Sequence, residues 1–178
     1  VIQPLDELLL KEELTAQYLR GLRSVSIVFM HGYRYTAHEK AARRLAAQVG
    51  FTQISTSHET SPMMKFVSRG DTTVVDAYLS PILRRYVAQV ADELPGVKLF
   101  FMQSSGGLTD AGSFQGKDAI LSGPAGGIVG MARTAKLADF DKVIGFDMGG
   151  TSTDVSHYAG EFEREFETQV AGVRMRAP

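Results

Sequence analysis

The sequence predicts an α/β fold, because segments with the patterns of strands and of helices alternate along the chain. Its first third reads strand, helix, strand, and such a crossover typically joins two parallel strands. A chain of 178 residues, 44% hydrophobic and 22% charged, has the size and composition of one globular domain. We therefore expect a single α/β unit over residues 1–178, with a sub-boundary near residues 60–70 as the alternative.

The first third has four expected elements. They are a helix from Leu5 to about Leu22, a strand over Val25–Met30, a helix from Thr36 to Val49, and a strand over Phe51–Ser57. Apolar residues three and four positions apart predict the first helix, and β-branched and aromatic residues predict the strands. Thr36 followed by Glu39 is a capping-box signature for the start of the second helix, and Gly50 suits its end.

The rest of the chain continues the α/β pattern and closes with strands. In order we expect a polar connection over His58–Asp71, a helix over Thr72–Leu94 that Pro81 kinks or splits, a strand over Val97–Met102, a helix from Gly123 to about Leu137, and strands over Lys142–Met148, Thr153–Tyr158 and Glu161–Thr168. Tight glycine turns separate the last three strands. These turns therefore predict an antiparallel meander whose outer edge strand has one face exposed to solvent.

Composition excludes several classes of function. Nineteen basic and twenty acidic residues leave a net charge of −1, so no basic field for nucleic acid is present. No apolar run approaches the ~18 residues of a membrane helix, so no membrane partner is expected. The absence of cysteine rules out a disulfide framework, a thiolate zinc site and a cysteine nucleophile. It also fits a reducing compartment, and we expect a cytoplasmic protein.

One segment near the C-terminus has the strongest chemical pattern. An apolar strand ends in Asp147, two glycines and three hydroxyl residues follow, and Asp154 begins the next strand. The glycines and hydroxyls offer backbone and side-chain donors to phosphate oxygens: Gly149, Gly150, Thr151, Ser152 and Thr153. The two carboxylates offer oxygen ligands to Mg²⁺. The alternative is a plain hairpin turn rich in glycine.

Other strand ends and glycines carry weaker patterns. Gly123, Gly126 and Gly127 precede or begin a helix, where they would either cradle an anion or allow close helix packing. His31 and Arg34 follow a strand end, where a base or an anion clamp could lie, although loop residues of this kind more often have no such role. The sequence contains neither a serine-nucleophile elbow nor a zinc-protease helix motif, which favours nucleotide chemistry.

These motifs together resemble the hydantoinase/oxoprolinase family, most closely its ATP-dependent 5-oxoprolinase branch. The resemblance rests on Phe146–Val155, Ser122–Gly127, Phe101–Ser104, Arg69-Gly70 with Asp76–Leu79, and Met30–Tyr33. It implies an actin-like ATPase, ribonuclease H-like fold: a mixed sheet with flanking helices and a C-terminal antiparallel hairpin meander. Many relatives have an acid where this chain has Ser105, so no metal or base role is carried over to that turn.

The resemblance also implies an activity. ATP and Mg²⁺ would drive hydrolysis of a cyclic amide, 5-oxo-L-proline to L-glutamate with ADP and phosphate, in glutathione metabolism. Asp147 and Asp154 would be the catalytic and metal-binding residues. The nucleotide would be held by Gly149, Gly150, Thr151, Ser152, Thr153, Gly123, Gly126 and Gly127. An N-methylhydantoinase or an acetone carboxylase β-type subunit is the alternative within the family, and a nucleotide-binding or scaffold module without catalysis is the alternative outside it.

Such folds have two lobes around a cleft, and this chain supplies one phosphate hairpin. The chain also begins with Val1 rather than Met. We therefore expect an internal piece of a longer enzyme, whose remaining lobes are its partners and which is inactive by itself. An apolar patch left exposed on such a piece would also allow a homodimer.

Overall fold

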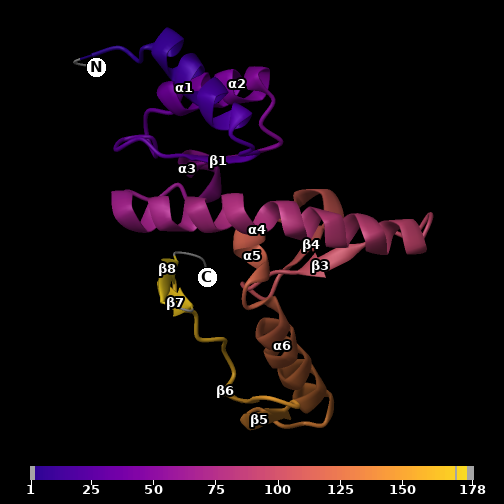
Figure 1. Cartoon of the computed structure of the whole chain (residues 1–178). Helices are drawn as coiled ribbons and strands as arrows, with labels where there is room; N and C mark the ends of the chain where they lie inside the picture. The colour runs from indigo at the N-terminus through magenta and orange to yellow at the C-terminus, as the bar shows by residue number, and fades with distance from the viewer. Residues whose placement is uncertain (1–2, 171, 176–178) are drawn as a thin grey trace. The chain divides into compact units, whose positions relative to one another are not determined.

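The computed structural model describes residues 3–170 and 172–175. These residues form two compact units (Figure 1). The first comprises residues 3–89, 115–117 and 167–175 apart from 171, and the second comprises residues 90–114 and 118–166. The expectation of one α/β unit over 1–178 stays a prediction. None of the described helices is long and apolar enough to cross a membrane.

A parallel strand pair organises the first unit. Strand β1 (Ser24–Ile27) pairs in parallel with β2 (Gln53–Thr56), and helix α2 (Ala37–Val49) makes the crossover. Helix α1 (Glu7–Leu19) packs on α2. Small and apolar side chains form the buried core of these elements: Ile27, Ala42, Leu45, Ala46 and Phe51. The predicted strand–helix–strand start is therefore confirmed.

The ends of α2 follow the sequence signals only in part. Gly50 adopts a left-handed conformation with φ of 113° at the C-terminus, as expected. The capping box is wrong, because the Thr36 side chain makes no capping hydrogen bond. Glu39 is instead fully buried and binds groups of other elements. A tertiary network has replaced the local cap.

The expected connection over His58–Asp71 is wrong as well. A short helix α3 (Ser57–Thr60) follows β2 directly, and the long helix α4 (Phe66–Glu93) starts well before Thr72. Pro81 lies inside α4 and does not split it. Asp76 of α4 accepts hydrogen bonds from the hydroxyls of Ser55 and Ser80 and from the backbone amide of Lys117. This network fixes α4 to β2 and to the start of α5 (Gly116–Ala119).

In the second unit, helix α6 (Ser122–Leu137) lies beside two hairpins. Strands β3 (Phe100–Met102) and β4 (Leu108–Asp110) form one antiparallel pair, and a 3-10 turn η1 (Ala111–Ser113) follows. Strands β5 (Val143–Met148) and β6 (Thr153–Tyr158) form the other. The prediction of a strand over Glu161–Thr168 is wrong. Alternation of apolar and charged residues suits a strand, but it does not by itself provide a neighbouring strand to pair with. Strand β7 (Thr168–Val170) pairs instead with β8 (Val173–Met175), in the first unit.

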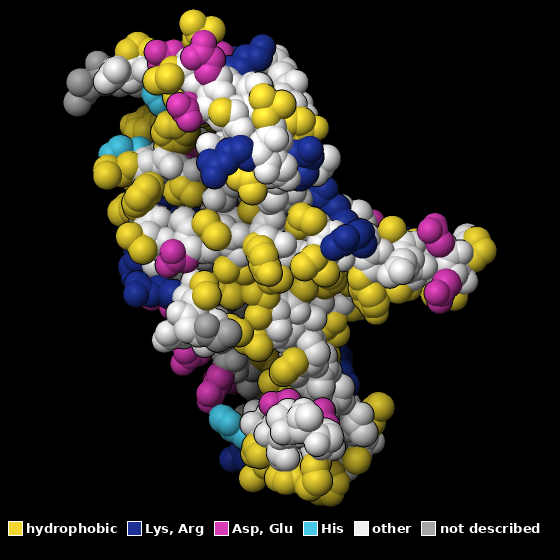
Figure 2. Space-filling model, in the orientation of Figure 1, with side chains coloured by type: hydrophobic (Ala, Val, Ile, Leu, Met, Phe, Trp, Pro, Cys, Tyr) yellow, Lys and Arg dark blue, Asp and Glu magenta, His cyan; other side chains and the backbone are white. Residues whose placement is uncertain are grey.

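The β5–β6 hairpin has two unlike faces. Gly145 and Ser156 face α6, where both approach the Met131 side chain. Four large apolar side chains on the hairpin are exposed: Ile144, Phe146, Met148 and Val155. Figure 2 shows hydrophobic side chains gathered over this hairpin, at the lower end of the view. Strand neighbours alternate between faces, so these side chains form an apolar surface opposite α6.

Candidate functional site

The two acids singled out in the sequence lie face to face in the hairpin. Asp147 of β5 is the direct register partner of Asp154 of β6. The turn beyond them is closed by a hydrogen bond of 2.9 Å from the Gly149 amide to the Ser152 carbonyl oxygen. Directly opposed side chains have Cβ atoms ~5 Å apart, so one ion could contact both carboxylates. The acids share a face with Gly145 and Ser156, which is the α6 side.

The hairpin tip is open to solvent. Asp147, Asp154 and every residue between them are exposed. Within residues 3–170 and 172–175, no hydrogen bond or ion pair engages the side chains of this segment. The described part of the chain also contains no cluster of three or more acidic or histidine residues suited to a metal. The hairpin therefore offers a pair of oxygen ligands rather than a complete protein cage.

The second glycine cluster begins α6 as the sequence suggested. Leu121 precedes the helix and provides no side-chain cap. A Cβ on Gly126 would lie 3.5 Å from Cγ of Met102 in β3, whereas Cβ atoms on Gly123 and Gly127 would meet nothing described within 4 Å. Close packing thus accounts for Gly126 alone. The anion-binding role of the cluster stays a prediction.

Ser105 lies in a locally satisfied turn between β3 and β4. The Gln103 amide donates to the Gly107 carbonyl oxygen at 2.8 Å, and Gly106 has a φ of 78°. The Ser105 hydroxyl accepts a bond of 3.4 Å from the Gly107 amide. His31 and Arg34 lie in the loop after β1, where their neighbours are the rings of Tyr33 and Tyr35. Ser105 belongs to the second unit, as does the β5–β6 hairpin, whereas His31 and Arg34 belong to the first.

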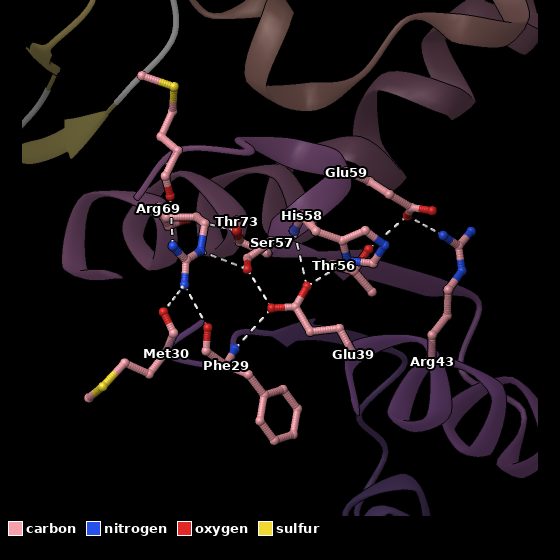
Figure 3. Close-up of polar contacts among 11 residues, drawn as sticks. Phe29, Met30, Glu39, Arg43, Thr56, Ser57, His58, Glu59, Arg69 and Thr73 are labelled. Atoms are coloured by element: carbon pink, nitrogen blue, oxygen red, sulfur yellow. Dashed lines mark hydrogen bonds and ion pairs between the residues drawn. The ribbon is translucent and has the colours of Figure 1, made fainter. Parts of the chain in front are cut away.

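A buried polar network in the first unit was missed by sequence reasoning (Figure 3). It joins Glu39 of α2 to Ser57 and His58, which directly follow β2, and to the loop after β1. The Oε1 atom of Glu39 accepts hydrogen bonds from the Phe29 amide at 2.9 Å and the Ser57 hydroxyl at 2.5 Å. Its Oε2 atom accepts from the backbone amide of His58 at 3.0 Å and lies 2.7 Å from Nδ1 of that residue.

Glu39 is an ionised carboxylate in this setting. Burial by itself raises its pKa, but hydrogen bonds from the Ser57 hydroxyl, the Phe29 amide and both donors of His58 outweigh burial. They hold the pKa of Glu39 below its ordinary value of 4.5. A signal for this residue was present in the sequence, because Glu39 shares the buried face of α2 with Ala42, Leu45 and Ala46.

Arg69 completes the network as a structural residue. Its side chain is fully buried. Nε donates to the Ser57 hydroxyl at 2.9 Å, and the two terminal nitrogens donate to four carbonyl oxygens, those of Phe29, Met30, Met63 and Met64. Guanidinium has five N–H donors, so all of them are used. Arg69 therefore stabilises two loops and has no donor left for a ligand.

Comparison with solved structures assigns the fold class. The chain has the actin-like α/β fold expected from its motifs. It superposes with a TM-score of 0.84 on a nucleotide-free acetone carboxylase, over 97% of this chain and 26% of that one, at 20% identity. It also superposes with a TM-score of 0.82 on the ATP-dependent caprolactamase from Pseudomonas jessenii, over 99% of this chain and 27% of that one, at 30% identity.

Sequence profiles then give the family. The chain belongs to the hydantoinase/oxoprolinase family, whose profile matches residues 69–178, and the profile of that family's N-terminal region matches residues 1–50. It is 44% identical to 5-oxoprolinase 1 of Arabidopsis thaliana and 42% identical to the 5-oxoprolinase of Saccharomyces cerevisiae. Both matches cover 100% of this chain and 14% of the relative. The chain thus spans about one seventh of these relatives.

Proposed function

We propose that this chain is the central part of an ATP-dependent 5-oxoprolinase, which converts 5-oxo-L-proline, ATP and water to L-glutamate, ADP and phosphate. The observation that carries the proposal is the match to proteins named 5-oxoprolinase along the whole chain. Because the chain spans 14% of those relatives, the activity is assigned to the full-length parent. The isolated chain is expected to be inactive, since part of a cleft cannot position two reactants.

The proposed chemistry requires activation of the amide. An unactivated lactam is a poor electrophile, and ATP supplies a phosphoryl group to the amide oxygen. This chain would contribute donors that hold phosphate oxygens. Gly149 and Gly150 let the backbone approach an anion closely, and the hydroxyls of Thr151, Ser152 and Thr153 add donors at the same exposed tip.

Asp147 and Asp154 fit the Mg²⁺ that such chemistry uses. Magnesium sites next to nucleotides typically take one or two protein carboxylates, with waters and phosphate oxygens completing the shell. The opposed, exposed pair across β5 and β6 supplies that donor set. When bound, the ion would neutralise charge on the phosphoryl oxygens. Asp147 and Asp154 would hold it at the hairpin tip.

A second candidate function also uses ATP but acts on a different cyclic amide. The likeness to the ATP-dependent caprolactamase, at 30% identity over nearly the whole chain, favours a larger lactam as the alternative substrate. Within the chain, nothing on the hairpin distinguishes the two rings, since the hairpin would contact phosphate and metal. The choice between the two substrates therefore depends on the remaining lobes of the parent.

We propose these remaining lobes as the partners that cover the apolar surface of β5–β6. Self-association through that surface is the competing arrangement, and a cytoplasmic location stays part of the proposal.

The test uses the full-length parent. Purified parent is supplied with ATP, Mg²⁺ and one candidate substrate at a time: 5-oxo-L-proline, ε-caprolactam, hydantoin or acetone with bicarbonate. Phosphate release and glutamate formation are followed together. We expect stoichiometric ADP and glutamate with 5-oxo-L-proline. ATP turnover that ignores 5-oxo-L-proline and responds to another ring would refute the assignment and give the substrate directly.

A further inference from the structure

The long helix α4 carries a stripe of exposed apolar side chains (Figure 1 shows the helix). In the part of α4 that belongs to the first unit, the side chains of Val67, Val74, Tyr78 and Ile82 are 51–72% exposed. They lie seven, four and four positions apart, which places them on one side of a helix. They form the α4 stripe, which is about 22 Å long at the helical rise of 1.5 Å per residue.

The buried face of α4 is polar instead. Its buried side chains are those of Ser68, Arg69, Thr72, Thr73, Asp76, Ala77 and Ser80. The hydroxyls of Thr72 and Thr73 donate to carbonyl oxygens one turn earlier in the helix, and Asp76 accepts from the Ser55 hydroxyl of β2. A surface helix of a globular protein normally buries its apolar face and exposes its polar one. Packing within the first unit therefore does not account for the α4 stripe.

The length of the relatives indicates what covers the stripe. The chain spans 14% of two 5-oxoprolinases, so most of a protein of that kind lies outside residues 1–178. A segment of the same chain is present at a high effective concentration, whereas a second copy must be recruited from solution. An apolar stripe has to be kept from water at every protein concentration. A covering segment from the same chain therefore fits the stripe better than a second copy does.

We propose that the α4 stripe is an internal interface of the parent, covered by an apolar face of the same chain from outside residues 1–178. This rests on the part of the proposed function that places the chain in a longer parent, and it holds for any substrate. Val67, Val74 and Ile82 offer aliphatic surface. Tyr78 adds a ring and a hydroxyl, so the covering face is apolar with one polar group opposite that hydroxyl. The interface is additional to the β5–β6 surface, which belongs to the second unit.

The first test identifies the neighbour of Tyr78 in the full-length parent. Tyr78 is replaced by the photoreactive residue p-benzoylphenylalanine, which keeps an aromatic ring and forms a covalent bond to groups that it touches on irradiation. Glu12 of α1, which is exposed and charged, receives the same residue as the control. Mass spectrometry identifies the joined peptides, and denaturing electrophoresis gives the mass of the product. We expect position 78 to join a peptide from outside residues 1–178 in a product with the mass of one chain, and position 12 to join none.

A smaller substitution serves if the photoreactive residue prevents folding. The chain contains no cysteine, and Val74→Cys replaces one small apolar side chain by another. The rate at which a maleimide labels this thiol in the native parent is compared with the rate for Glu12→Cys, each measured on the peptide that contains the position. A thiol buried in an interface is inert, so labelling at position 74 should be slower by about tenfold or more. In urea the two rates should be equal.

Three results would overturn the proposal. Equal labelling of positions 74 and 12 in the native parent, or equal crosslinking from positions 78 and 12, means that the stripe has no cover of its own. A crosslinked product with the mass of two chains makes the stripe a contact between copies. A joined peptide from within residues 1–178 means that this chain covers its own stripe. Neither readout needs turnover, so a parent that ignores 5-oxo-L-proline refutes the proposed substrate and leaves the result for the stripe intact.

Discussion

The hydroxyl of Ser24 in β1 donates a hydrogen bond to the carbonyl oxygen of Ala77 in α4. Ala77 lies four residues before Pro81, whose missing N–H would otherwise have been the partner of that carbonyl. A strand 53 positions away in sequence thus supplies the donor that the proline lacks. This bond explains how α4 continues through Pro81, and it fixes β1 to the helix.

The bond between Ser24 and Ala77 predicts coupling between Ser24 and Pro81. Ser24→Ala should lower the free energy of unfolding by about 1 kcal/mol, because the buried carbonyl loses its partner. In a Pro81→Ala background, Ser24→Ala should lower the free energy of unfolding by less. An alanine in place of the proline restores the backbone N–H that can bond the Ala77 carbonyl oxygen. A double-mutant cycle in urea measures the difference. Ser26→Ala, on the same strand, is the control, and equal costs in both backgrounds would exclude the explanation.

The elements that the sequence predicted well are those with local signals. The β1–α2–β2 start, helix α6 and the β5–β6 hairpin each have periodicity or turn residues confined to one segment. The hairpin places Asp147 opposite Asp154 because strand pairing around a short turn leaves few alternatives. For that reason the candidate phosphate and metal residues could be located from sequence alone, although their roles stay predictions.

The missed features depend on residues far apart in sequence. Thr36 and Glu39 satisfy the local capping pattern, yet Glu39 binds Ser57 and His58, which lie 18 and 19 residues away. Arg69, which the sequence singled out only through the family resemblance, is buried among the carbonyls of two loops. Pairing of this kind follows from the tertiary fold. No pattern within one segment could have indicated that Glu39 and Arg69 would share the Ser57 hydroxyl.

The Glu39 network predicts acid sensitivity of the first unit. The folded pKa of Glu39 lies below its ordinary value of 4.5, so the unfolded chain binds more protons as the pH falls. The stabilisation is therefore fully present above about pH 4.5 and is lost as the pH falls through the folded pKa. Urea unfolding of wild type between pH 7 and pH 3 should show this loss.

Glu39→Gln should remove both the stabilisation and part of the acid dependence. A neutral amide cannot accept all four hydrogen bonds, so unfolding at pH 7 should become easier by about 2 kcal/mol or more. Glu12→Gln, an exposed change on α1, should leave the midpoint and its pH profile unaltered. An acid profile of Glu39→Gln identical to wild type would contradict this account.

Contact between β5 and α6 predicts a strong effect at one glycine. A Cβ on Gly145 would collide with the Met131 side chain and lie 2.7 Å from the Ser156 hydroxyl. Gly145→Ala should therefore destabilise the second unit by about 1–3 kcal/mol, as overpacking does elsewhere. Gly130→Ala on α6, where a Cβ would meet no atom of the described residues within 4 Å, should instead stabilise it by up to about 1 kcal/mol. Urea midpoints of the two variants should shift in opposite directions.

The opposed acids of the hairpin predict a large effect on activity with none on stability. On the proposed function, Asp147→Asn in the parent should lower kcat for ATP hydrolysis coupled to ring opening by about 10²-fold or more, because the Mg²⁺ ion would lose one of its two proposed carboxylate ligands. The Mg²⁺ concentration for half-maximal rate should also rise. Asp147 is exposed and has no described hydrogen bond, so the thermal midpoint should equal that of wild type. Asp141→Asn, exposed two residues before β5, is the control. Full activity of the Asp147→Asn parent would instead favour the alternative that this chain is a nucleotide-binding or scaffold module that takes no part in catalysis.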